Sequence, residues 1–140
     1  MFDAAGRLAS LRARRVVVIP DDPRKAIAPM GGSLGGTALA CSVGHAMLLG
    51  TARPSRVIVT EGDPDFLTWA IRAVTVQSDR YAVLGVVSGS WDQSIADRIP
   101  TGATVCLRLH RDDAGAGYRR GVVSTLYGRV NVVELEGSAR

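Results

Sequence analysis

The sequence has few residues of several informative kinds. It contains only two cysteines, Cys41 and Cys106, and they have neither the spacing of a metal site nor the density of a disulfide framework, so we expect two reduced thiols. No apolar run approaches the roughly 18 residues that a membrane-spanning helix needs. The N-terminus also lacks the continuous apolar stretch of a signal peptide. We therefore expect a cytoplasmic protein without a membrane partner.

Lysine is nearly absent, and this affects how the positive charge can be used. Sixteen of the 17 basic side chains are arginine, whose planar guanidinium suits bidentate contacts with phosphate. The net charge of +4 is uneven: residues 1–60 carry eight basic and three acidic side chains, whereas residues 61–140 carry nine and ten. The basic first part, which includes Arg14 and Arg15, predicts weak and salt-dependent binding to single-stranded nucleic acid.

The first 55 residues are a series of short segments. Residues 3–13 predict a helix, and the β-branched run at 15–19 predicts a strand. Short apolar pieces between glycines and prolines predict a small antiparallel unit over residues 15–50. The glycine-rich GGSLGG at 31–36 fits neither a dinucleotide-binding nor a Walker motif, which favours a flexible connection over a phosphate cradle. Residues 1–55 are thus expected to form a basic segment and a small β-rich subdomain.

From Arg56 onward, strands and helices alternate. RVIVT, YAVLGVV, ATVCLRL and RVNVVEL have the composition of buried strands, and a helical segment lies between each pair. This alternation predicts an α/β core over residues 56–140, with about four mainly parallel strands sandwiched by helices. In the first helical segment, Asp63 is the expected cap, and the expected apolar face comprises Phe66, Leu67, Ala70, Ile71 and Val74.

The segment LRLHRDDAGAGY, residues 107–118, contains the tripeptide HRD of a protein-kinase catalytic loop. A kinase needs an asparagine five residues after the aspartate, where this chain has Gly117. It also needs a glycine-rich nucleotide loop, a strand lysine and a DFG segment, none of which is present. The kinase interpretation is excluded.

Acidic side chains follow two of the predicted strands. Glu61 comes directly after the first core strand, and His110 to Asp113 follow the third. The carboxyl ends of parallel strands meet at one edge of a sheet, which is where α/β proteins place their ligands. Carboxylates gathered there are suitable ligands for a hard divalent cation.

Two motifs together resemble the TOPRIM domain of bacterial primases, topoisomerases and some nucleases. In VIVTEGDPDFL, Glu61, Gly62 and Asp65 stand where that family has its Glu-Gly strand end and following aspartate. In VCLRLHRDDAG, Asp112 and Gly115 match the family's Asp-x-Asp-x-Ala-Gly signature. The segments GVVSGSW and PMGGSLGGTALA are similar to parts of phage- and plasmid-type primases, so the resemblance covers roughly residues 25–135. It implies a TOPRIM-like Rossmannoid fold.

The resemblance implies a metal site and assigns roles to its residues. Glu61 and Asp112 are the expected catalytic residues, with Glu61 as general acid or base, and Glu61, Asp112, His110 and Asp65 are the expected metal ligands. His110 replaces the first aspartate of the family signature, and imidazole is a poor ligand for Mg²⁺ but an acceptable one for Mn²⁺. His110 is also open to a purely structural role, and Asp113 is expected to cap the next helix rather than supply the missing charge.

Arginines near the second motif are the expected phosphate contacts. Arg111, Arg119 and Arg120 follow the third core strand and are expected to bind nucleotide or nucleic acid together with Arg14 and Arg15, although each fits a solvated surface equally well.

Three functions are compatible with the resemblance. The leading one is the catalytic part of a primase-like DNA replication protein of a mobile element, which makes primers from nucleoside triphosphates on single-stranded DNA beside a helicase or another replication protein. The second is a metal-dependent TOPRIM nuclease. The third is a catalytically weak module that binds nucleic acid or a partner, which the substitution by His110 favours.

Overall fold

A computed structural model describes residues 1–15, 17, 20, 26–27, 34–76, 79–87 and 89–135. The strands within these residues are β1 (Phe2–Asp3), β2 (Ala13–Arg14), β3 (Ala26–Ile27), β4 (Thr37–Ala40), β5 (Arg56–Glu61), β6 (Tyr81–Val86), β7 (Thr104–Arg108) and β8 (Asn131–Glu134). The helices are α1 (Ser42–Leu48), α2 (Gly62–Thr75), α3 (Gln93–Ala96) and α4 (Asp113–Leu126). From β5 onward, strand and helix alternate as the sequence predicts.

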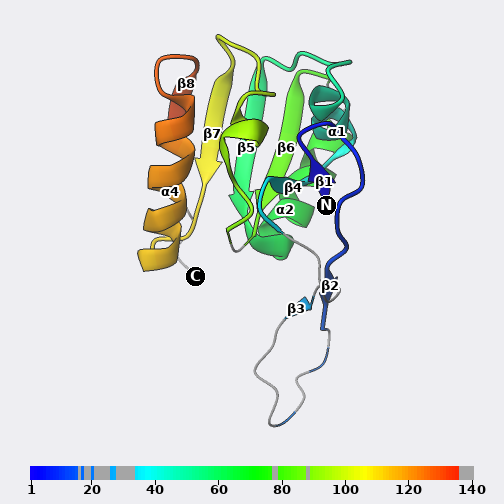
Figure 1. Ribbon diagram of the computed structural model, residues 1–140. Helices are drawn as coiled ribbons and strands as arrows, with labels where there is room; N and C mark the ends of the chain where they lie inside the picture. The colour runs from blue at the N-terminus through cyan, green and yellow to red at the C-terminus, as the bar shows by residue number, and fades with distance from the viewer. Residues whose placement is uncertain are drawn as a thin grey trace.

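One mixed sheet organises these elements. Its six strands have the order β1-β4-β6-β5-β7-β8 (Figure 1). Strand β5 pairs in parallel with both β6 and β7, and β7 pairs in parallel with β8. Strand β4 pairs antiparallel with β6, and β1 pairs antiparallel with β4, so these two strands extend the sheet beyond its parallel core. The fold is therefore α/β with a mostly parallel sheet, and it is compatible with a Rossmann-like architecture.

The N-terminal segment differs from the expectation in several places. Strands β1 and β4 belong to the main sheet rather than to a separate β-rich unit, whereas β2 and β3 form a two-stranded antiparallel pair. The apolar segment HAMLLG, expected in the antiparallel unit, lies largely in helix α1, which begins after Cys41. Residues 16, 18 and 19 of the strand predicted over 15–19, and residues 31–33 of the glycine-rich segment 31–36, lie outside the described residues.

The prediction of a helix over residues 3–13 is wrong, because a tight turn follows β1 instead. The carboxylate of Asp3 accepts hydrogen bonds from the backbone N–H groups of Ala5 and Arg7, both at 2.9 Å. Gly6, with φ of 74°, then adopts a left-handed conformation that helices do not contain. Aspartate often competes with helix formation in this way, since its side chain satisfies nearby backbone donors.

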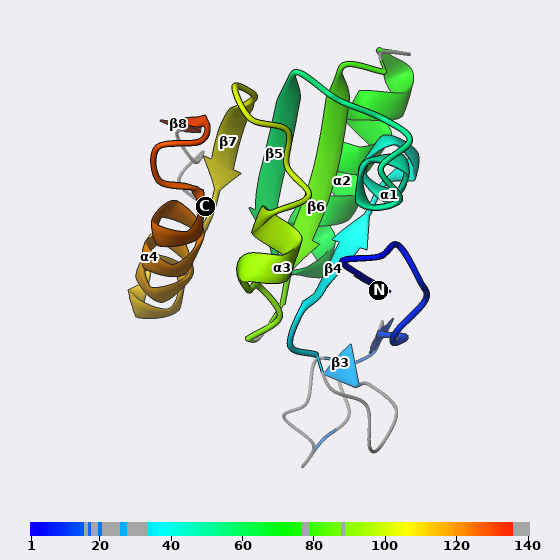
Figure 2. The ribbon, with the colours of Figure 1, turned by 45° about the horizontal axis from the view of Figure 1, so that its top comes forward.

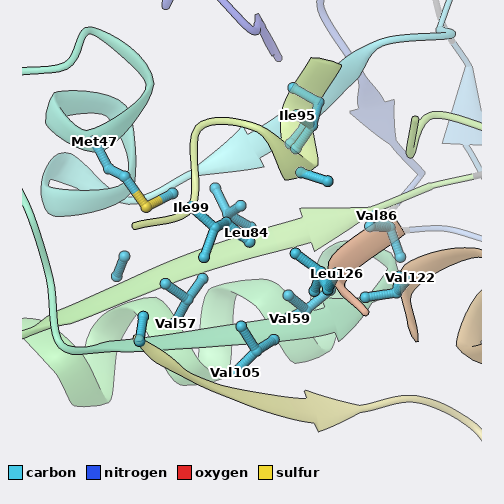
Figure 3. Close-up of a cluster of buried hydrophobic side chains, with 14 of the residues drawn as sticks. Met47, Val57, Val59, Leu84, Val86, Ile95, Ile99, Val105, Val122 and Leu126 are labelled. Atoms are coloured by element: carbon cyan, nitrogen blue, oxygen red, sulfur yellow. The ribbon is translucent and has the colours of Figure 1, made fainter. Parts of the chain in front are cut away.

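Helices cover both faces of the sheet. Figure 2 shows α2 behind the sheet and α3 in front of it. The larger core lies on the face of α1, α3 and α4, where Met47 and Ile99 pack with β-sheet valines and with Leu126 of α4 (Figure 3). The smaller core, beneath α2, contains Ile58, Phe66 and Val83. Among the described residues, none of the helices combines the length and apolarity that a membrane crossing requires.

Helix α2 buries a different stripe from the one expected. Phe66 is buried, and Trp69, Ala70 and Ala73 pack beside it against the sheet. Three other members of the predicted apolar face are mostly exposed: Leu67 at 56%, Ile71 at 66% and Val74 at 64%. The prediction was therefore correct for Phe66 and Ala70 and wrong for these three, which form a second apolar stripe on the flank of the helix.

Candidate functional site

The chain passes from β5 into α2 without an intervening loop. Glu61 is the last residue of β5 and also precedes the first helical residue, Gly62, whose φ of 75° allows this abrupt change of direction. Asp63 does not cap the helix as predicted. Its carboxylate instead forms an ion pair with Arg12, whose Nε lies 2.9 Å from Oδ1 and 3.1 Å from Oδ2. The basic N-terminal segment is thereby attached to the first turn of α2.

Glu61, Asp65 and His110 meet at the carboxyl edge of the sheet. The backbone N–H of His110 donates a hydrogen bond to Oε2 of Glu61 at 3.0 Å. The imidazole of His110 lies between the two acids, with Nδ1 3.8 Å from Oε1 of Glu61 and Nε2 3.3 Å from Oδ2 of Asp65. The Glu61 side chain is only 12% exposed, whereas the His110 side chain is 47% exposed and therefore accessible from solvent. Three of the four predicted metal ligands are thus neighbours.

The fourth predicted ligand, Asp112, begins helix α4. Its Oδ1 accepts a hydrogen bond from the backbone N–H of Gly115 at 2.8 Å, so Asp112 is the N-cap of this helix. The prediction that Asp113 has this role is wrong, because Asp113 is the first helical residue and its side chain is exposed. Asp112 is itself exposed, and its Oδ2 forms no hydrogen bond within the described part of the chain.

Gly115 joins the two motifs through a very close approach. A Cβ atom at this position would stand in contact with the backbone oxygen of His110 and 3.1 Å from Oε2 of Glu61. Asp112 bonds to the N–H of the same glycine. Glu61 and Asp112, which are 51 residues apart in the sequence, therefore both lie beside Gly115 at one edge of the sheet. The sequence predicted that they share this edge, although it did not predict the contact that brings them together.

The predicted phosphate-binding arginines are dispersed. Arg14 lies near the site, with Nη1 3.8 Å from Oδ2 of Asp63. Arg119 is 2.9 Å from Glu134 of β8 in an exposed ion pair, and Arg111 and Arg120 are exposed. Arg15 is half-buried. Of the five, Arg14 lies beside Asp63 in space, and Arg111 lies between His110 and Asp112 in the sequence.

The residue types at this edge suit a divalent cation better than their present arrangement does. Two carboxylates and an imidazole are a donor set that Mn²⁺ accepts. Among the residues that the structure describes, however, no three His, Cys, Asp or Glu side chains are placed to hold one ion together. The ring of His110 stands between Glu61 and Asp65, so it would have to turn before both acids could reach a common cation.

The contact between Arg12 and Asp63 is a feature that the sequence did not indicate. The two residues are 51 positions apart, and their side chains are 21% and 13% exposed. Nothing in the local sequence pattern marks them as partners, because the pairing depends on how the N-terminal segment returns to α2.

No family model, curated protein or solved structure matches this chain. What the structure itself defines is an α/β domain with a mostly parallel six-stranded sheet and a group of acidic side chains at its carboxyl edge.

Proposed function

We propose that this chain is a TOPRIM-type domain that performs metal-dependent nucleotidyl transfer in a primase-like replication protein. The observation that carries the proposal is the placement of Glu61 and Asp112 on either side of Gly115. These residues come from the two motifs that resemble the TOPRIM signature, and ligands of parallel α/β sheets bind at this edge. The proposed partners are single-stranded DNA and nucleoside triphosphates, together with a helicase or other replication protein in the cytoplasm.

Each acidic side chain has a distinct task in this proposal. Glu61 and Asp112 would hold the cation, Asp65 would contribute a further oxygen, and His110 would be its nitrogen ligand. A bound cation would polarise a phosphoryl oxygen of the nucleotide. Glu61, which is largely shielded from water, would exchange a proton with the attacking or leaving oxygen. Arg111 and Arg120, both exposed, are free to approach the phosphates of the template or nucleotide.

A primer-synthesis assay tests this function. Purified protein is given a single-stranded template and labelled nucleoside triphosphates with Mn²⁺ or Mg²⁺. We expect products with Mn²⁺, and Glu61→Gln should reduce their rate by about 10²-fold or more, as loss of a general acid or base does. Asp113→Asn removes an equal charge from an exposed position next to the capping residue Asp112 and serves as the control, with activity near that of the wild type.

A second candidate function is a catalytically weak module that binds nucleic acid or a partner. The specific observation in its favour is that the ring of His110 lies between the acids, 3.3 Å from Oδ2 of Asp65 and 3.8 Å from Oε1 of Glu61, and so occupies the space between them. If the wild type and Glu61→Gln are equally inactive in primer synthesis, this candidate replaces the first. Cleavage of the template instead of primer synthesis, if abolished by Glu61→Gln, would indicate the nuclease alternative.

A further inference from the structure

A cavity of about 590 Å³ lies at the end of the sheet opposite to the acidic residues. It is bounded by the loop that leads into β5, by the turn between α3 and β7, and by Arg129 just before β8. These are the amino ends of three parallel strands, at the top of the sheet in Figure 1. The volume lies within the range of roughly 300–1,000 Å³ that is typical of small-ligand sites.

The cavity carries an excess of positive charge. Arg53, Arg98 and Arg129 line it, and Asp97 is the one acidic side chain among its lining residues, so its net charge is 3 − 1 = +2. Arg129 is already engaged: Nη1 is 3.0 Å from Oδ1 of Asp97, and Nη2 donates to the backbone oxygen of Ile99 at 3.2 Å. The guanidinium groups of Arg53 and Arg98 are exposed and form no ion pair or hydrogen bond within the described residues.

The remaining lining is partly apolar. Met47 and Ile99 lie next to each other at the end of the main core (Figure 3), and both are only 1% exposed, so they form the floor beneath the cavity. Pro54 and Pro100 line it from the two loops. A ligand here would therefore meet two exposed guanidinium groups together with the half-buried apolar side chains of Ala52 and Pro100.

We propose that this cavity binds a phosphate-bearing ligand of nucleotide size. Arg53 and Arg98 contact its phosphate, because a guanidinium fork pairs with two phosphate oxygens and neither group has another partner among the residues that the structure describes. The apolar wall receives the base or sugar. The shared chemistry belongs equally to a free nucleotide and to one unit of a nucleic-acid strand, and the binding experiment separates these two sources.

This site is independent of the acidic edge. None of its lining residues belongs to the TOPRIM-like motifs, and the two sites lie at opposite ends of β5 and β7. Binding measured in the presence of EDTA, without divalent cations, therefore does not depend on whether the acidic residues hold a metal.

The experiment is a calorimetric titration at low salt, in EDTA, with three probes: inorganic pyrophosphate, ATP and a ten-residue oligothymidylate. The test variant is Arg53→Gln/Arg98→Gln, which changes two exposed side chains that form no hydrogen bond or ion pair with the described residues. The control is Arg7→Gln/Arg72→Gln, which removes the same charge from exposed positions outside the cavity. We expect the test variant to weaken binding by about tenfold or more, because charge-assisted contacts are lost, and the control to change it by less than about twofold.

Each outcome decides the question. Cavity-dependent binding of ATP and pyrophosphate identifies a free nucleotide as the ligand, whereas cavity-dependent binding of the oligonucleotide alone identifies a nucleic-acid strand. The proposal is overturned if the wild type binds none of the probes. It is equally overturned if the test and control variants lose affinity to the same extent, because net charge rather than the cavity would then explain the binding.

Discussion

Gly115 is the residue on which the geometry of the acidic site depends most. Any side chain there would overlap the backbone oxygen of His110 and press on the carboxylate of Glu61. Since the atom that a Cβ would overlap belongs to the backbone and not to the end of a flexible side chain, a substitution has no inexpensive way to relax. The close approach of the His110 backbone thus explains on steric grounds why position 115, in the second of the two motifs, holds a glycine.

We predict that Gly115→Ala destabilises the protein by about 1–3 kcal/mol, the usual cost of overpacking a tight site. Gly121→Ala is a matched control in the same helix, because a Cβ there meets nothing within 4 Å. In that open position alanine should stabilise α4 by about 0.5–1 kcal/mol. Chemical denaturation of the two variants measures both values. A Gly115→Ala variant as stable as the wild type would mean that β7 and α4 do not approach each other this closely.

Asp112 has a structural role as a helix cap and a proposed role as a metal ligand, and some substitutions remove both at once. It caps α4 through Oδ1, and the proposed function also uses its charge. Asp112→Ala removes both and would cost about 0.5–2 kcal/mol of stability through the lost cap alone. Asp112→Asn keeps a capping oxygen and removes only the charge, so it is the variant suited to tests of metal binding.

At the scale of single elements, α2 shows how two stripes can coexist on one helix. The sheet contacts Phe66, Trp69, Ala70 and Ala73, which share one face of the helix because each lies three or four residues from another member of the set. Leu67, Ile71 and Val74 follow the same spacing on the adjacent flank, but no described element covers them. A helical period identifies residues that share a face, and it does not identify which of two apolar faces meets the sheet.

We predict that substitutions on the two stripes differ sharply in their cost. Phe66→Ala, at a position only 9% exposed, should reduce the free energy of unfolding by about 3–5 kcal/mol because it leaves a cavity under α2. Ile71→Ser, at a position 66% exposed, should change it by less than about 0.5 kcal/mol. Urea denaturation of both variants distinguishes the stripes. Equal and large losses would indicate that α2 is rotated so that Ile71 faces the sheet.

The C-terminal elements could be predicted because each carries its own signals. The strands are apolar runs, Pro100 follows α3, and Tyr118, Val122 and Leu126 recur every fourth residue in α4. The N-terminal segment could not be predicted in this way. Its strands are short, and β4 depends on pairing with distant β6, whereas β1 depends on pairing with β4. Asp3 also favours a turn over the helix that composition suggested.

The candidate site was predictable to a similar degree. The rule that parallel strands end at one edge placed Glu61 with His110 and Asp112 correctly, because it depends only on element order. The individual contacts were not predictable. The pairing of Arg12 with Asp63 depends on where the N-terminal segment lies in the fold. Whether Asp112 or Asp113 caps α4 depends on a difference of one residue in where the helix begins.

At the scale of the whole molecule, a group of acidic side chains gathers at one end of the parallel sheet, where Arg12, Arg14 and Arg111 also lie, and three arginines lie with Asp97 at the other. The carboxyl ends are followed by Glu61, Asp63, Asp65, Asp112 and Asp113. The amino ends border the cavity with Arg53, Arg98 and Arg129. A cation at one end and a phosphate at the other are the ligands that this distribution favours, and the predicted basic patch of residues 1–60 is partly neutralised, since Arg12 and Arg14 both approach Asp63.

The central claim is that the acidic edge binds a divalent cation, and calorimetric titration with Mn²⁺ and Mg²⁺ tests it most directly. The samples are the wild type, His110→Asp, Asp112→Asn and Glu61→Gln. We predict that the wild type binds Mn²⁺ more tightly than Mg²⁺, because a nitrogen ligand suits Mn²⁺ better. His110→Asp should strengthen Mg²⁺ binding by adding a carboxylate, and Asp112→Asn and Glu61→Gln should weaken binding of both ions. If all four proteins bind the two metals alike, or none binds either, the acidic edge is not a metal site and the proposed nucleotidyl transfer is wrong.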